Sequence, residues 1–130
     1  MNLPENIAEL TMIASRETIE AYAALTFDYN PLHLDEAFAA GTPFGKPIAH
    51  GTLALNLLLQ AIAKSLEGHR QHAGQRLDIR FSVPVKVGDS MRTGGRRLAE
   101  GEGRYEVWVK NSADQVVLGG ALTIGPVDDG

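Results

Sequence analysis

Apolar and polar residues alternate strictly between Asp78 and Val87, which is the clearest β-strand signal in the chain. Its apolar members are Ile79, Phe81, Val83, Val85 and Val87. A period of two places alternate side chains on opposite faces of a strand, so this pattern predicts a half-buried strand with one face on a core. Gly88 and Asp89 predict the turn that ends it.

Further strands are predicted on both sides of this segment. Residues 7–14 alternate less regularly and predict a first strand. After the Gly88 turn, strands are expected at residues 90–99, 104–110 and 116–124, with turns at 101–103 and 111–114 between them. Gly94 and Gly95 predict a β-bulge. The last strand is apolar enough to predict a position inside the sheet.

Helical structure is predicted between the first two strands. Ser15 is a candidate N-cap, and Glu17 lies in the first turn of the helix that follows. One face of this helix carries Ile19, Tyr22, Ala23 and Thr26. The sequence Asp28-Tyr29-Asn30-Pro31 ends it, because a proline disfavours helical geometry at the preceding residue. A short helix is expected at residues 35–40, before an irregular loop over 41–47.

The most apolar helix is predicted from His50-Gly51 to about Leu66. Nearly every side of it is covered by Leu53, Leu55, Leu57, Leu58, Leu59, Ala61 and Ile62. A helix that is apolar all round is usually buried on all sides, so the strands are expected to wrap it. One buried helix followed by antiparallel strands predicts the α+β class, as a single domain over 1–130 with a tail at 126–130.

Composition and charge narrow the function classes. The 130 residues are 44% hydrophobic and 22% charged, as in an ordinary globular domain. The net charge of −4 and the pI of about 5.5 favour neither a nucleic-acid partner nor an anionic membrane surface. The lack of cysteine excludes disulfides, thiolate catalysis and Cys-based zinc sites. The acidic N-terminus and the short apolar segment 53–63 predict no secretory signal and no membrane span, so a cytoplasmic location is expected.

An acid and an imidazole, Asp28 and His33, lie five residues apart around a proline turn. A carboxylate and a histidine held on a rigid turn can share one water molecule as general base and general acid. The same residues also have a structural interpretation, in which Asp28 ends a helix, Asn30 shapes a turn and His33 is a structural histidine. On local chemistry alone the structural interpretation is favoured, since Asp, Asn and Pro are standard turn formers.

The start of the apolar helix is a second candidate, in the sequence Pro47-Ile48-Ala49-His50-Gly51. A glycine that begins a helix has a free N–H and allows close approach of a ligand. The aligned peptide dipoles favour negative charge at that end, so Gly51 could polarise a carbonyl oxygen. Taken alone, His50 and Gly51 are better interpreted as the start of a core helix.

Together these segments resemble the MaoC-like, (R)-specific enoyl-CoA hydratase family. Residues 23–35 match the family segment A-x-L-T/S-x-D-x-N-P-L-H-x-D throughout. The sequence Pro47 to Gly51 fits at a familiar spacing, and Phe81 to Asp89 looks like the family's strand with its P-V-x-x-G-D ending. The resemblance extends over about residues 15–124. It implies a hotdog fold, with the helix wrapped by an antiparallel sheet, and a homodimer or dimer of dimers with the acyl tunnel near the interface.

The resemblance also implies an activity, the reversible hydration of trans-2-enoyl thioesters to (R)-3-hydroxyacyl thioesters. Asp28 and His33 would activate water and handle the proton at the α-carbon, and either could be the base. The Gly51 N–H would bind the thioester oxygen. Asn30 would shape the turn or orient His33, and His50 would bind or orient the substrate. No metal or redox cofactor is implied, because coenzyme A or an acyl-carrier protein enters as part of the substrate.

One position departs from the family pattern. Some members carry a serine on the central helix where this chain has Leu59, which cannot form a hydrogen bond. Either Asn56, one turn earlier, substitutes for it or the polar contact is absent. The departure concerns acyl specificity more than the reaction.

Three weaker signals are not assigned a function. The loop from Gly41 to Pro47 lacks the Ser/Thr of a phosphate-binding loop. His69 and His72 are expected in an exposed polar loop rather than at a metal. Basic residues that could meet coenzyme A phosphates, or simply face solvent, are Arg76, Arg80 and Lys86.

Two alternative functions are open at this point. Other hotdog proteins hydrolyse thioesters, many with an acid on the central helix, and residues 51–66 contain neither Asp nor Glu. Other hotdog domains are non-catalytic acyl-binding subunits of a heteromeric complex, against which the intact Asp28/His33 pair argues.

Overall fold

The computed structural model describes residues 3–67, 75–99 and 103–125. The loop with His69 and His72, most of the turn at 101–103 and the tail at 126–130 lie outside the described residues. Of the helices in the described ranges, none combines the length and the apolarity that crossing a bilayer requires.

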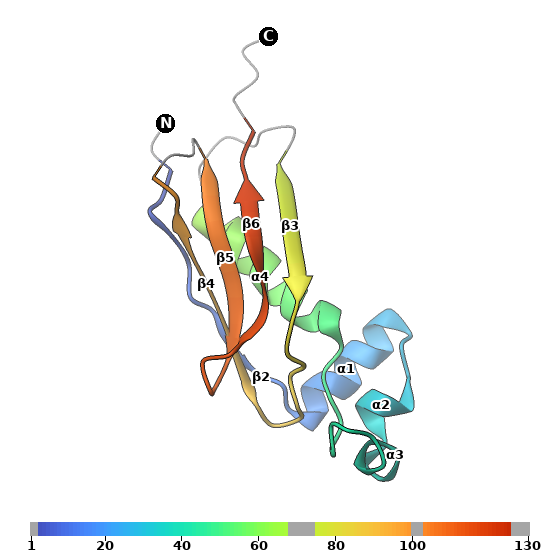
Figure 1. Cartoon of the computed structure of the whole chain (residues 1–130). Coiled ribbons are helices and arrows are strands. Elements are labelled where there is room, and N and C mark those ends of the chain that lie inside the picture. The colour runs from blue at the N-terminus through green and yellow to red at the C-terminus, as the bar shows by residue number, and fades with distance from the viewer. Residues whose placement is uncertain (1–2, 68–74, 100–102, 126–130) are drawn as a thin grey trace.

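A six-stranded antiparallel sheet with one helix against its face forms the body of the molecule (Figure 1). The strands are β1 (Asn6–Ile7), β2 (Thr11–Ile13), β3 (Arg76–Phe81), β4 (Ser90–Arg97), β5 (Arg104–Asn111) and β6 (Val116–Thr123). They are ordered β1-β4-β5-β6-β3, and β2 also pairs with β4. β6 therefore lies inside the sheet, as its apolar sequence predicted, and β3 forms an edge. The predicted α+β class is confirmed.

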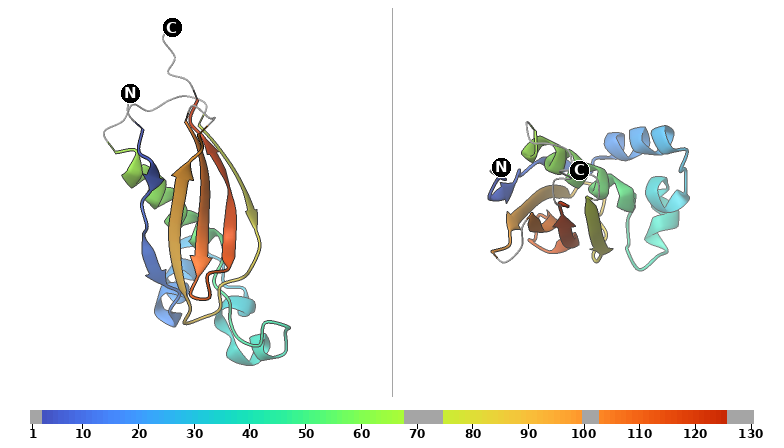
Figure 2. Two further views of the ribbon diagram at one scale, coloured as in Figure 1. Left: turned by 60° about the vertical axis from the view of Figure 1, so that its left-hand side comes forward. Right: turned by 90° about the horizontal axis from the view of Figure 1, so that it is seen from above.

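The helices are α1 (Arg16–Thr26), α2 (Pro31–Leu34), α3 (Glu36–Ala40) and α4 (Gly51–Ser65). Seen from above, α4 lies against one face of the curved sheet, and α1 to α3 gather to one side of it (Figure 2). Ser15 caps α1 as predicted, because its Oγ accepts a hydrogen bond from the Thr18 N–H at 3.1 Å. Asp35 caps α3 in the same way through the Phe38 N–H.

The core lies between α4 and the inner face of the sheet. From the helix it takes Leu53, Ala54, Leu57, Leu58, Ala61 and Ile62. From the sheet it takes Met91, Tyr105, Val107, Val109, Leu118 and Leu122. The prediction that α4 is buried on all sides is wrong for the single chain: the side away from the sheet is open, and Leu59 is 45% exposed there. The apolar run could not show this, because leucine also occurs outside the buried side, at Leu55 and Leu59.

The predicted first strand over residues 7–14 is interrupted. β1 and β2 both pair with β4, but Ala8 to Leu10 leave the ladder between them. The buried side chain of Thr93 replaces the missing ladder bonds: its Oγ1 donates to the Ala8 carbonyl at 2.8 Å and accepts from the Leu10 N–H at 2.9 Å. Ser65 Oγ accepts from the Ala8 N–H. These polar partners come from distant segments, so local alternation did not reveal the interruption.

The predicted strand over 78–87 is also shorter than expected. β3 ends at Phe81, and Pro84 has no N–H to continue a ladder. Residues 85–87 instead pair with residues 47–49, through Ala49 N–H to the Val85 carbonyl at 2.7 Å and Val87 N–H to the Pro47 carbonyl at 2.8 Å. The regular alternation therefore spans two different surroundings. Phe81, at the end of β3, is 52% exposed and does not lie in the core.

No bulge occurs at Gly94-Gly95, where β4 pairs with β5 in unbroken register. The glycines make room for neighbouring side chains instead. A Cβ on Gly94 would lie 2.5 Å from Nε1 of Trp108, and one on Gly95 would lie 2.8 Å from Ile7. The register shift in this part of the sheet is between Val109 and Lys110, on the β6 side.

Asp89 ties the turn after residue 87 to the β5–β6 loop. Its Oδ1 accepts hydrogen bonds from the N–H groups of Ser90, at 2.7 Å, and Ser112, at 3.3 Å. Burial raises the pKa of Asp89, but hydrogen bonds from the Ser112 hydroxyl and from these two N–H groups, together with the charge of Lys46, outweigh burial. The pKa of Asp89 is therefore lowered below its ordinary value.

Candidate active site

The turn that carries Asp28 begins with an unusual backbone at Phe27. Phe27 ends α1 in the left-handed conformation, with φ 57° and ψ 31°, and its N–H bonds to the Ala23 carbonyl. For a residue other than glycine this conformation costs about 1–2 kcal/mol. The Phe27 side chain is 84% exposed and recovers none of that cost by burial within the chain. The result is a sharp change of chain direction immediately before Asp28.

Asn30 builds the next part of the turn. Its N–H bonds to Asp28 Oδ1 at 3.3 Å, and its own Oδ1 accepts from the Leu32 N–H at 2.9 Å, which makes it the N-cap of α2. With Pro31 in the first position, this single helical turn presents His33. Asn30 thus acts on the backbone, and its side-chain oxygen is occupied.

The tautomer of His33 follows from its hydrogen bond. Nδ1 lies 2.7 Å from the Ile48 carbonyl oxygen, which can only accept, so Nδ1 carries the proton. Neutral His33 therefore has its lone pair on Nε2, which lies 4.0 Å from Asp28 Oδ2. The His33 side chain is 12% exposed and that of Asp28 is 49% exposed, so the pair is open to solvent on the Asp28 side.

The separation of 4.0 Å is too long for a direct hydrogen bond between these atoms. An oxygen placed about 2.8 Å from each of them would make two good hydrogen bonds. The angle at that oxygen would be about 90°, which a water molecule or a hydroxyl group can adopt. The pair is therefore spaced to hold one such oxygen between a carboxylate and the basic nitrogen of an imidazole.

His50 lies directly behind this pair. Its Nε2 is 3.0 Å from the Asp28 carbonyl oxygen, and its ring is stacked on that of His33, with centroids 3.9 Å apart and planes 25° apart. The pairing of residues 47–49 with 85–87 fixes the chain that leads to His50. Asp28, His33 and His50 are thus brought together from both sides of the loop.

Gly51 begins α4, so its N–H has no acceptor within the helix. Its backbone does not require glycine, because its φ is not positive and an added Cβ would meet Cε1 of Phe81 at 3.4 Å, an ordinary contact. What the missing side chain leaves is space beside a free N–H at the positive end of a helix. That space belongs to a cavity.

The cavity has a volume of about 390 Å³, and His33, His50 and Gly51 form one wall. The other walls are almost entirely apolar, with Phe44, Ile48, Ala49, Ala54, Phe81, Val83, Pro84, Val85 and Val117 beside Ser82. Among the lining residues Phe81 is half exposed, whereas Ala54 is buried. The arrangement can hold an apolar chain with its reacting group between the Gly51 N–H and the Asp28/His33 pair.

Asn56 and Leu59 do not line this cavity. Asn56 Nδ2 donates instead to the Tyr22 hydroxyl at 3.1 Å, and Leu59 faces the open side of α4. The sequence left two alternatives open. The cavity of the single chain shows no polar contact from Asn56, and a role of Asn56 in acyl binding stays a prediction. From the sequence, Tyr22 was assigned only to the apolar face of a helix. A buried tyrosine hydroxyl needs a polar partner, and that requirement could have indicated its contacts.

Asp28, His33 and His50 each bring one possible ligand atom to within 4.8 Å of the others, which is close enough for a metal ion. The stacking of the two imidazoles argues against that use. Ligand lone pairs lie in the ring planes, and nearly parallel planes do not converge on one ion. One nitrogen of each ring is also committed to a carbonyl oxygen. The cluster fits proton transfer better than coordination.

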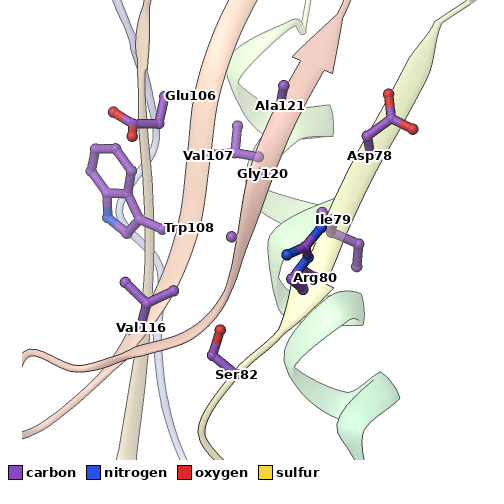
Figure 3. Close-up of a pocket in the computed structure, with 11 residues that line it drawn as sticks. Asp78, Ile79, Arg80, Ser82, Glu106, Val107, Trp108, Val116, Gly120 and Ala121 are labelled. Atoms are coloured by element: carbon purple, nitrogen blue, oxygen red, sulfur yellow. The ribbon is translucent and has the colours of Figure 1, made fainter.

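A larger hollow of about 600 Å³ lies on the outer face of the sheet (Figure 3), and neither Asp28 nor His33 is among the residues that line it. Its floor is the small residues of β6 around Gly120, with Glu106 and Trp108 on one side and Asp78 and Arg80 on the other. Arg80 therefore faces this hollow and not the cavity beside Gly51. Asp78 and Glu106 are each paired with an arginine at 2.8–2.9 Å, so their charges serve surface ion pairs.

Comparisons with known proteins identify the family of the chain. The family described as "MaoC like domain" matches residues 4–119. The (R)-specific enoyl-CoA hydratase of Aeromonas caviae is 46% identical over 74 residues, which are 56% of this chain and 54% of that protein, so the match spans about half of that relative's length. A mitochondrial 3-hydroxyacyl-[acyl-carrier-protein] dehydratase of Arabidopsis thaliana is 31% identical over 120 residues, or 87% of this chain and 70% of that protein. Among solved structures, an (R)-hydratase from A. caviae involved in PHA biosynthesis superposes with a TM-score of 0.76 and 29% identity, covering 96% of this chain and 98% of that one.

Proposed function

Because the chain belongs to the MaoC-like domain family, we propose that it catalyses the reversible hydration of trans-2-enoyl thioesters to (R)-3-hydroxyacyl thioesters. The observation that carries the proposal is the 4.0 Å space between His33 Nε2 and Asp28 Oδ2, beside the free N–H of Gly51. The names of the relatives in Aeromonas and Arabidopsis support hydration and dehydration of acyl thioesters as the reaction class.

In the proposed mechanism, a water molecule occupies the space between His33 and Asp28. Asp28 accepts one of its hydrogens and orients it, and His33 Nε2 takes the other proton as the water oxygen bonds to C3 of the enoyl group. The C2–C3 π electrons move toward the thioester carbonyl, and the Gly51 N–H stabilises the negative oxygen. His33 then returns its proton to C2, which restores the thioester and leaves a hydroxyl on C3.

This sequence of steps consists only of proton transfers and the addition of water. It therefore needs no metal and no redox cofactor, and coenzyme A or an acyl-carrier protein enters as part of the substrate. Since His33 handles both the water proton and the C2 proton, the hydrogen and the hydroxyl add to the same face of the double bond.

A hydration assay with crotonyl-CoA tests the proposal, and the loss of the enoyl absorbance measures the rate. Asp28→Asn and His33→Ala are expected to reduce kcat by about 10²–10⁴-fold, the range for loss of a general acid or base. Asp35→Asn is the matched control, because asparagine retains the cap of α3 outside the cavity. Full activity in a folded Asp28 or His33 variant would refute the assigned roles. Release of free coenzyme A without hydration would show a thioester hydrolase instead.

We also propose that two copies associate. β3 forms an edge of the sheet, paired with β6 on its other side, and such an edge can pair with a second strand. Large apolar side chains are exposed in the single chain at the end of α1, on α4 and at the end of β3, namely Leu25, Phe27, Leu59 and Phe81. Light scattering coupled to size-exclusion chromatography is expected to give twice the 14.0 kDa chain mass. A monomer that is fully active would refute a dimer as the working form, and activity only with a second, different chain would indicate a heteromer.

A further inference from the structure

His50 is the most enclosed polar side chain of the site, at 4% exposure. Its Nε2 must carry the proton, because the Asp28 carbonyl oxygen at 3.0 Å can only accept. Nδ1 therefore holds the lone pair of a neutral ring, and among the described residues no group donates to it. A buried acceptor without a partner costs about 1–3 kcal/mol, so stability alone does not account for a histidine here.

Two contacts of the His50 side chain are with the acid/base pair. Its N–H holds the backbone of Asp28, and the face of its ring supports the ring of His33 at 3.9 Å. The first contact fixes the backbone position from which the Asp28 side chain extends. The second limits tilting of the His33 ring about its hydrogen bond to the Ile48 carbonyl. His50 thus touches both residues whose side chains must stay 4.0 Å apart.

Tyr22 supports His50 from the other side. Its ring meets the His50 ring edge-on, with centroids 5.1 Å apart at 66°. Its hydroxyl donates to Thr52 Oγ1 at 2.8 Å and accepts from Asn56 Nδ2 at 3.1 Å, so the ring is fixed to the first turns of α4. The same turns present the Gly51 N–H. The carbonyl-binding group and the proton-transfer pair are therefore held by one connected set of contacts.

We propose that His50 is a positioning residue, which sets the separation of Asp28 and His33 by bonding the backbone of one and stacking on the ring of the other, with Tyr22 as its support. The inference rests on the proposed hydration. A displacement of about 1 Å in reacting groups can lower a rate by about 10²-fold, so the lost contacts are expected to act on kcat.

Two substitutions separate the two contacts. His50→Phe retains a flat ring against His33 and loses the donor to Asp28, whereas His50→Gln retains a donor at the place of Nε2 and loses the ring. Each is expected to lower kcat by about 10–10²-fold and to leave KM within about threefold. Circular dichroism and urea unfolding check that each variant is folded, and His50→Phe is expected to unfold no earlier, since it removes the unpartnered nitrogen.

The proposal is overturned if both folded variants retain kcat within about twofold, or if their loss lies in KM, which would mean that His50 acts on substrate binding. A second readout needs no turnover. In protein labelled with ¹⁵N-histidine, the His33 ring resonances are expected to move and broaden in His50→Gln more than in His50→Phe, and unchanged resonances in both would also overturn it. A wild-type protein that hydrates no enoyl thioester would refute the proposed function, while this NMR comparison would still test the positioning.

Discussion

Replacement of Gly51 by alanine should make this protein more stable and far less active. The backbone at Gly51 is helical, and an added Cβ meets only the ring of Phe81, at 3.4 Å or more. Gly→Ala at such a position stabilises by about 0.4–1 kcal/mol, chiefly because the unfolded chain has less freedom to lose. For a domain of this size that corresponds to a rise in Tm of about 2–5 °C.

The same methyl group would stand where a thioester carbonyl must approach the Gly51 N–H. Loss of one such donor typically costs about 10²–10³-fold in kcat, or about 2.7–4 kcal/mol of transition-state stabilisation. The predicted signature of Gly51→Ala is therefore opposite in sign for the two measurements. Tm would rise by a few degrees while crotonyl-CoA hydration falls by about 10²-fold or more.

Gly41→Ala is the matched control for this experiment. Gly41 has a φ of −84°, and a Cβ there would meet the Phe38 carbonyl oxygen at 3.5 Å, but it does not line the cavity. It should show the stabilisation without the loss of activity. If Gly51→Ala hydrates crotonyl-CoA within about threefold of the wild-type rate while Tm rises, Gly51 is not the carbonyl-binding group.

Three further predictions follow from the cavity, the turn and the sheet. Ala54→Leu adds three carbons to a buried wall of the cavity. Benzene in a cavity of about 150 Å³ takes about 25 Å³ per carbon, so this change should shorten the longest enoyl-CoA accepted by about three carbons while crotonyl-CoA is still hydrated. An unchanged chain-length profile would contradict it. Phe27→Gly should raise the free energy of unfolding, measured with urea, by about 0.5–1 kcal/mol. This is the left-handed strain that glycine relieves, less the cost of the greater freedom of the unfolded chain. A decrease would show that Phe27 is buried against a second molecule. Asp89→Asn should be less stable than wild type at pH 7. A carboxyl whose pKa is lowered in the folded state stabilises the fold above its unfolded pKa of about 3.9. The difference in stability should vanish as the pH falls through the folded pKa, and a constant difference down to pH 2 would contradict the prediction.

The parts of the fold that the sequence could predict are those whose partners are close along the chain. Ser15 and Asp35 cap helices through N–H groups three residues away, so each is visible as a local pattern. The apolar run of α4 likewise indicated a helix against a core, although it did not show which side of that helix is buried. By contrast, the detour of residues 8–10 depends on Thr93, more than eighty residues later, and nothing near Ala8 indicates it.

The candidate site divides in the same way. Asp28, Asn30 and His33 lie in one short segment, and its resemblance to the family motif made them candidates where local chemistry favoured an ordinary turn. The tautomers of the two histidines were not predictable from the sequence. The Ile48 carbonyl sets which nitrogen of His33 is basic, and the Asp28 carbonyl sets it for His50. The apolar wall of the cavity was also missed. This wall exists because Pro84 cannot continue the strand and residues 82–85 cross to the loop before α4. The strict alternation had predicted one uninterrupted strand there.

Gly94 and Gly51 show how structure turns a residue type into an argument about function. Both stood out in the sequence, the first as a bulge and the second as a helix start. Gly94 proves to be required by its neighbour, since a Cβ would lie 2.5 Å from the indole nitrogen of Trp108, and nothing about a ligand follows from it. Gly51 is required by neither its neighbour nor its backbone, and it lines the same cavity as His33. A glycine that the fold does not need, placed where a carbonyl could bind, is best explained by the substrate.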